Sequence, residues 1–210
     1  MWKLTLGFLA CALAVALSMA DEAQPASKAA ARKLQKSYVW YDGDQPRRVW
    51  INPELMAEFD REDRDGRPEG GTVRSNFPKA RALKGRHKGA RIWQMEPGIH
   101  ADAAAKHLNG KRPKNKYSPV FHDRGTNAAR KRALPGNVIV FLNPDWDQSE
   151  VDQWASGRKL EIVKKLDIGR NVVVVKTGPG LETLEMANSL RGTEGVVSTT
   201  PDWWEEVTLR

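Results

Sequence analysis

Residues capable of chemistry are few in this sequence, and they lie apart. Its four histidines all fall in the first 122 residues: His87, His100, His107 and His122. His100 and His107 are seven apart, which places them on one helix face, so a metal site is one interpretation and solvated surface histidines are the favoured one. No Gly-x-Ser-x-Gly, His-Glu-x-x-His or phosphate-binding Gly-Lys-Ser/Thr motif occurs. We therefore expect a protein that is not an enzyme and has no cofactor or metal.

The amino-terminal residues have the composition of a secretory signal. A positive start precedes an apolar run over residues 4–17 and small residues that permit cleavage after Ala20. The run is too short to span a bilayer stably. We expect a signal peptide over residues 1–20 and a periplasmic or secreted protein with no membrane attachment after cleavage. Cys11 lies within the run; its lipidation is the disfavoured alternative, and the mature chain should lack disulfides.

Charge divides the chain into two parts. Residues 21–136 contain 25 Lys and Arg against 14 Asp and Glu, whereas residues 137–210 contain 8 against 12. The basic part is compatible with nucleic-acid binding, but export argues against that partner, and a solvated flexible segment is the simpler explanation.

In the basic part, the sequence predicts a linker over residues 21–36 and then a small β-rich region over residues 37–134. Residues 38–41 and 47–51 are strand-prone runs separated by turn-forming residues, so they predict a β-hairpin. A basic insertion over residues 60–88 contains little that could form a core, so we expect a loop or disorder there.

Further elements are expected in the same region. Residues 52–59 begin with Asn-Pro, which is typical of a helix cap followed by proline at the first helical position, so they predict a short helix. Residues 91–95 and 117–121 are strand candidates, and residues 101–108 predict one or two helical turns between them.

Residues 135–201 carry strand and helix signals in the order β-α-β-β-α-β. Asp147 and Glu150 form a capping box for the first helix, and apolar residues at helical spacing from Leu181 predict the second. Two βαβ units of matching length predict an α+β, ferredoxin-like domain. Both helices should cover one face of a four-stranded antiparallel sheet and leave the other face open for a partner. The strands are expected at 138–142, 160–166, 171–177 and 196–199.

Several protein classes share this fold, so the fold alone does not determine the function. RNA-recognition domains place aromatic residues on their central strands, but residues 172–175 contain none. Metal-carrying members use a Cys-x-x-Cys loop after the first strand, but residues 143–146 contain no cysteine. We therefore expect neither nucleic acid nor metal as the partner of the sheet.

Two sets of residues resemble known proteins. The first is similar to the propeptides of subtilisin-like proteases and comprises residues 135–141, 162–166, 172–176, 195–197 and 200–202. The second resembles the external chaperones of the Aeromonas serine protease, a kexin-like subtilase, and comprises residues 38–43, 49–53, 118–121 and 133–136. In that family a separate propeptide-like protein helps the protease to fold in the periplasm and holds it inactive. The resemblance implies an intermolecular chaperone and protease inhibitor, with no protease domain expected after it.

The resemblance also implies a role for residues 202–210, which we call the tail. In this interpretation the tail blocks the active-site cleft of the protease through Val207, Thr208, Leu209 and Arg210. The alternation of Val207 and Leu209 suits an extended peptide that pairs with substrate-binding strands. Arg210 would occupy the position before a scissile bond, as a product does, and the alternative is a solvated terminal residue.

Four tryptophans have separate interpretations. Trp203 and Trp204 either cover an edge of the protein's own sheet or anchor the partner, as tryptophans at interfaces often do. Trp146 and Trp154 are expected in the core of the first βαβ unit.

The sequence leads to two hypotheses about function, from different classes. The favoured one is an exported chaperone and inhibitor of a cognate subtilisin/kexin-like serine protease, encoded nearby, that docks by its open sheet. The alternative is a non-inhibitory periplasmic adaptor, or structural binding module, with the same ferredoxin-like fold.

Overall fold

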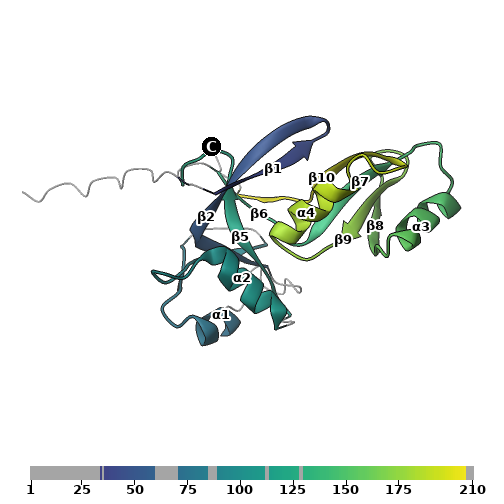
Figure 1. Cartoon of the computed structure of the whole chain (residues 1–210). Helices are drawn as coiled ribbons and strands as arrows, with labels where there is room; N and C mark the ends of the chain where they lie inside the picture. Colours follow the sequence, from purple (N-terminus) through teal and green to yellow (C-terminus); the bar gives the residue numbers. More distant parts are fainter. Residues whose placement is uncertain are drawn as a thin grey trace, which may run out of the picture. The chain divides into compact units, whose positions relative to one another are not determined.

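The described residues form two antiparallel sheets, which a few helices accompany (Figure 1). The predicted mixed α+β class is confirmed. This computed structural model describes residues 34, 36–59, 71–84, 89–111, 114–127 and 130–206. They belong to one compact unit, Ala31–Arg210. The predicted signal peptide and most of the predicted linker lie outside the described residues.

The first sheet is built around β2, the longest of the described strands. β2 pairs antiparallel with β1, β4 and β5. The predicted hairpin over 38–51 is confirmed as β1 and β2, and the strands expected at 91–95 and 117–121 are β4 and β5. The strand order is β11-β6-β5-β2-β4-β3, with β1 also on β2. The strands are β1 (Ser37–Asp42), β2 (Gln45–Phe59), β3 (Arg81–Ala82), β4 (Arg91–Gln94), β5 (Lys116–His122), β6 (Lys131–Ala133) and β11 (Trp204–Glu205).

The short helix predicted over residues 52–59 is wrong, because β2 continues to Phe59. The Asn52 Oδ1 accepts a hydrogen bond from the Glu54 N–H at 2.9 Å, as a helix cap would, but it does so in a β-bulge between Asn52 and Met56. Pro53, which has no N–H to donate, sits in this bulge, where the pairing with β5 is interrupted.

A second reason explains why residues 52–59 do not look like a strand in the sequence. Met56 packs in the cluster with Trp93 on one side of β2, whereas Leu55 and Ala57 pack in the cluster with Ile92 on the other. A strand buried on both faces lacks the alternation of apolar and polar residues that identifies strands in a sequence. Its partners β4 and β5 therefore decide its conformation.

The insertion over residues 60–88 is not wholly a loop, so that prediction is wrong in part. Within it lie helix α1 (Gly71–Asn76) and strand β3, while residues 60–70 and 85–88 lie outside the described residues. Val73 of α1 is fully buried in the cluster of Met56 and Trp93. The expected turns over 101–108 form α2 (Ala101–Gly110), which buries Ala101, Ala104, Ala105 and Leu108 in the same cluster.

The second sheet has four strands in the order β10-β7-β9-β8, and all of its pairs are antiparallel. The predicted capping box of α3 is confirmed. The Glu150 N–H donates to Asp147 Oδ1 at 2.9 Å, and the Asp147 N–H donates to Glu150 Oε2 at 2.7 Å. The elements run along the chain as β7 (Asn137–Leu142), α3 (Gln148–Gly157), β8 (Ile162–Leu166), β9 (Val172–Lys176), α4 (Leu181–Leu190) and β10 (Val196–Pro201).

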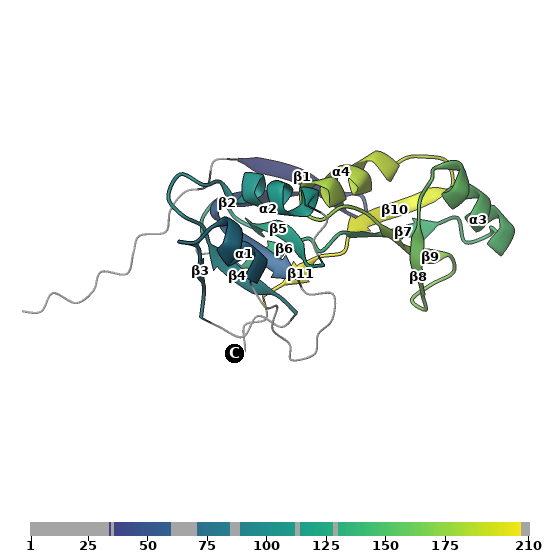
Figure 2. The same cartoon turned by 90° about the horizontal axis from the view of Figure 1, so that it is seen from below.

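Both α3 and α4 pack against the same face of this sheet (Figure 2). Their side chains form one cluster with Val138, Val140 and Leu142 of β7 and with alternate residues of β9. Trp154 is 4% exposed in this cluster, so its predicted place in the core is confirmed, whereas Trp146 is only partly buried against the cluster. None of the described helices is long and apolar enough to cross a membrane.

Replacement of Gly195 by alanine should destabilise the protein strongly, because two penalties combine. Gly195 has φ 78°, and a Cβ there would overlap the Trp146 ring. Gly192 has a similar φ of 73°, but a Cβ there would have no neighbour within 4 Å, so Gly192→Ala is the matched control. We expect about 1–2 kcal/mol from the backbone in both variants and roughly 1–3 kcal/mol more for Gly195→Ala. Urea unfolding measures the difference, and equal losses would contradict the packing argument.

Candidate functional site

The face of the four-stranded sheet away from α3 and α4 is apolar at its centre. Ile139 and Phe141 alternate along β7 with the residues that face the helices, so they point to the opposite side. Ile139 lies opposite Val174, and Phe141 lies opposite Val172, which is also opposite Leu166 of β8. We call the surface formed by these five side chains the open face.

The five side chains of the open face differ in burial. Ile139, Phe141 and Leu166 are half-buried, whereas Val172 and Val174 are 1% and 7% exposed. None of the five belongs to a hydrophobic cluster that the described residues form with a helix. The surface of the open face therefore comes mainly from Ile139, Phe141 and Leu166, and no described helix packs on it.

Polar residues and two bulges border the open face. Lys164 of β8 lies opposite Val174, while Ser198 and Thr200 of β10 lie opposite residues of β7. Each edge strand contains a bulge, and the extra residues are Val163 and Val197, which are 47% and 64% exposed. Bulges and lysines at an edge discourage pairing of one strand edge with another. Polar residues thus surround the apolar centre of the open face.

The first residues of the tail leave the second sheet and join the first. The Asp202 N–H donates to the Asn137 carbonyl at 3.1 Å, next to the end of β10. β11 then pairs antiparallel with β6, and the Glu206 N–H donates to the Lys131 carbonyl at 3.0 Å. The predicted inhibitory residues Val207, Thr208, Leu209 and Arg210 lie outside the described residues.

Both tail tryptophans pack against the chain itself. The Trp203 ring is edge-on to Trp40 and Phe121, with centroids 5.4 and 5.6 Å away. The Trp204 ring is edge-on to Phe59 at 6.3 Å. Each indole contributes to a core cluster of the seven-stranded sheet. Trp203 and Trp204 are each partly exposed, and that exposed part could contact a partner. Their role as anchors for a partner stays a prediction.

Opposite charges hold the tail to β6. Lys131 Nζ lies 2.9 Å from both carboxylate oxygens of Glu206. Glu205 pairs with Arg130 and with Arg132, each at 3.0 Å. No role was predicted for these residues from the sequence, although the basic run Arg130-Lys131-Arg132 and the pair Glu205-Glu206 are complementary charges far apart in the chain.

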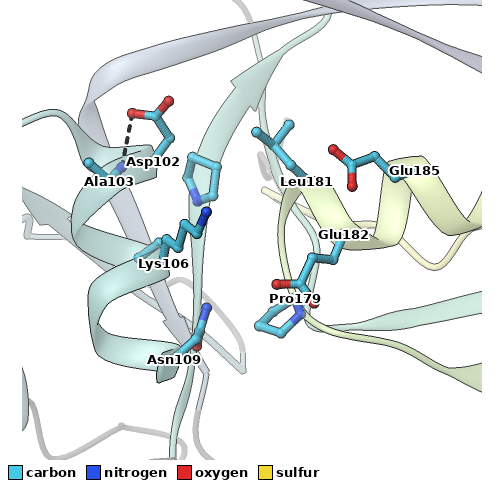
Figure 3. Close-up of a pocket in the computed structure, with 10 residues that line it drawn as sticks. Asp102, Ala103, Lys106, Asn109, Pro179, Leu181, Glu182 and Glu185 are labelled. Carbon is cyan, nitrogen blue, oxygen red and sulfur yellow. Dashed lines mark hydrogen bonds between the residues drawn. The ribbon is translucent and has the colours of Figure 1, made fainter. Parts of the chain in front are cut away.

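A cavity of about 370 Å³ lies between α2 and α4 (Figure 3). Lys106 of α2 and the carboxylates Glu182 and Glu185 of α4 line it, together with Asn109, whose amide bonds to the backbone of Tyr117. These side chains form no nucleophile and base pair. We assign no chemistry to the cavity.

A third carboxylate that lines this cavity, that of Asp102, already has two partners. Asp102 Oδ1 accepts from the Ala103 N–H, and Lys36 Nζ lies 3.2 Å from Asp102 Oδ2. The Tyr38 hydroxyl, and after it the Asp102 carboxylate, raise the pKa of Lys36 above its ordinary value.

The structure does not bring the histidines together. His100 precedes α2 without a side-chain cap bond, and His107 is edge-on to Phe77 at 6.3 Å. His122 is fully buried in β5, with a ring nitrogen 3.1 Å from Asn52 Nδ2. Among the described residues, no three His, Cys, Asp or Glu side chains form a group that could hold a metal. His87 lies outside the described residues.

The open face and the anchored tail are therefore the two features from which a function can be argued. Comparisons of the chain with protein-family models, curated proteins and solved structures returned no match.

Proposed function

We propose that this protein is an exported, non-enzymatic chaperone and inhibitor of a subtilisin/kexin-like serine protease. The observation that carries the proposal is the apolar open face, on a sheet whose last strand leads directly into the tail. The kind of partner is inferred from the sequence resemblance to external chaperones and subtilase propeptides. The open face is the surface to which we expect this partner to bind.

The proposal includes a ferredoxin-like domain of the subtilase-propeptide type over residues 135–201. The strand order β10-β7-β9-β8 supports it, as do the two helices on one face. In a β-α-β-β-α-β chain this order places β7 and β9 at the centre of the sheet. Those central strands supply four of the five open-face side chains.

In this mechanism the open face binds surface helices of the protease. Side chains such as Phe141 and Ile139 lose their remaining contact with water on docking, at roughly 25 cal/mol per Å² of apolar surface. A ligand that binds only the native-like protease stabilises that state by mass action, by about 2.7 kcal/mol at a concentration one hundred times its Kd. The protease is thereby drawn from a trapped intermediate to its folded form.

Inhibition is the task of residues 207–210. They would pair as an extended strand with the substrate-binding strands of the protease. Arg210 would then fill the pocket for the residue before the scissile bond, where a kexin-like enzyme prefers a basic side chain. The chaperone and inhibitor activities would thus use different parts of the chain.

Deletion of Thr208, Leu209 and Arg210 should weaken inhibition of a basic-specific subtilase by orders of magnitude, because it removes the residues that enter the cleft. The yield of active protease on refolding should be unchanged, since the open face is intact. Inhibition constants and recovered activity measure the two effects. Arg210→Lys is the matched control and should keep most of the inhibition. If the full-length protein inhibits no protease of this class, the inhibitor function is rejected and the adaptor alternative is favoured.

Replacement of Phe141 by lysine should impair chaperoning, because it places a charge at the centre of the open face. Loss of one buried aromatic side chain corresponds to roughly tenfold weaker binding or more. Refolding yield at limiting protein concentration measures the loss. Ile99→Lys is the control, since Ile99 is also a partly exposed apolar residue but lies before α2, outside the four-stranded sheet. Equal yields for the two variants would exclude the open face as the docking surface.

A further inference from the structure

We propose that β6 and β11 form a clamp that fixes the beginning of the tail, with Arg132 as its central positioning residue. This inference rests on the proposed inhibitor function, because it concerns how residues 207–210 are delivered to the protease. The clamp comprises β6, β11 and the side chains of Trp40, Asp123, Trp203 and Glu206 that contact them.

The backbone supplies the first part of the clamp. Trp204 lies opposite Ala133 and Glu205 lies opposite Arg132 in the β6–β11 ladder. The Glu206 N–H extends the pairing with its bond to the Lys131 carbonyl. A two-residue strand at the edge of a sheet is weak by itself, so side chains must stabilise it.

Arg132 contributes to that stabilisation through contacts with four side chains. Its side chain is 15% exposed and pairs with Asp123 at 2.7 Å and with Glu205 at 3.0 Å. Its guanidinium carbon lies 5.6 Å from the Trp40 ring centroid and 5.5 Å from that of Trp203. Arginine can form planar contacts with carboxylates and aromatic rings at the same time, which lysine cannot. One side chain of β6 thus connects the hairpin, the residue that follows β5, and the tail.

Arg130 provides a comparison within the same strand pair. It also contacts Glu205 at 3.0 Å, but its side chain is 53% exposed and no ring contact to it is present among the described residues. Exposed ion pairs of this kind contribute about 0–1 kcal/mol. The clamp therefore depends on Arg132 far more than on Arg130.

Anchoring has two consequences for inhibition. Residues 202–206 are already ordered in the free protein, so their conformational entropy, roughly 1–2 kcal/mol per residue for the backbone, is not lost again on binding. Arg210 follows Glu206 by four residues, which span at most about 14 Å when extended. A protease with Arg210 in its cleft must therefore bring the rim of that cleft close to β11.

The test compares Arg132→Gln with Arg130→Gln in the full-length protein. The inhibition constant for a basic-specific subtilase and the hydrogen-exchange rate of the Glu206 amide are measured for each. We expect Arg132→Gln to raise both by about tenfold or more, and Arg130→Gln to change each by less than about threefold. Exchange of the β7 and β9 amides should stay slow in both variants, which shows that the four-stranded sheet remains folded. Arg132→Lys should fall between the wild type and Arg132→Gln.

Glu205→Gln is a second test, because it weakens the clamp from the side of the tail and leaves the sequence of β6 unchanged. It should also raise the inhibition constant and the exchange rate of the Glu206 amide. If Arg132→Gln and Glu205→Gln both inhibit like the wild type, the clamp is rejected while the inhibitor function stands. If the wild type does not inhibit, the inhibitor function fails, and the role assigned to the clamp in delivering the tail fails with it. In that case the Glu206 amide still reports whether Arg132 anchors the tail.

Discussion

The pairing of β2 with strands on both sides is the constraint on which the rest of the structure depends. Before its bulge β2 pairs with β1 and β5, and after it with β4 and β5. This arrangement buries Glu58 completely, where its carboxylate accepts hydrogen bonds from Trp93 Nε1 at 2.8 Å, Asn115 Nδ2 at 2.9 Å and the Tyr117 hydroxyl at 3.3 Å. Because an unpaired buried carboxylate is very unfavourable, these donors tie β2, β4 and β5 to one register.

The same strand forms the base on which the tail rests. Val49 and Ile51 of β2 join Trp40, Phe121 and Leu134 in a cluster that also receives Leu184 of α4 and Trp203 of the tail. The Gly180 N–H donates to the Leu134 carbonyl at 3.0 Å, where the chain enters α4. Helix α4 and the beginning of the tail therefore share one apolar cluster with the first sheet.

This division of labour suits a protein with two proposed tasks. The open face lies on the four-stranded sheet, whereas the tail is held by the seven-stranded sheet, and Asp202 connects them. Two contacts linked by a short ordered connection act as one bivalent ligand, since the first contact raises the effective concentration of the second. In the proposed mechanism, the four-stranded sheet alone would present the tail without such support. The first sheet supplies that support through β6, which pairs with β11.

Local signals in the sequence determined the elements of residues 137–201 and the β1–β2 hairpin, because caps, turns and apolar periodicity act over a few residues. They also indicated an open face, since a sheet with both helices on one side leaves the other uncovered. Only tertiary structure decided that Asn52 closes a bulge and not a helix, because its bond to the Glu54 N–H is the same in either case. Only tertiary structure joined Glu205 to Arg132, since a two-residue strand has no period to detect and its partner lies 73 positions away in the sequence. The tail is positioned by contacts between segments distant in the chain, and no local pattern encodes such a pairing.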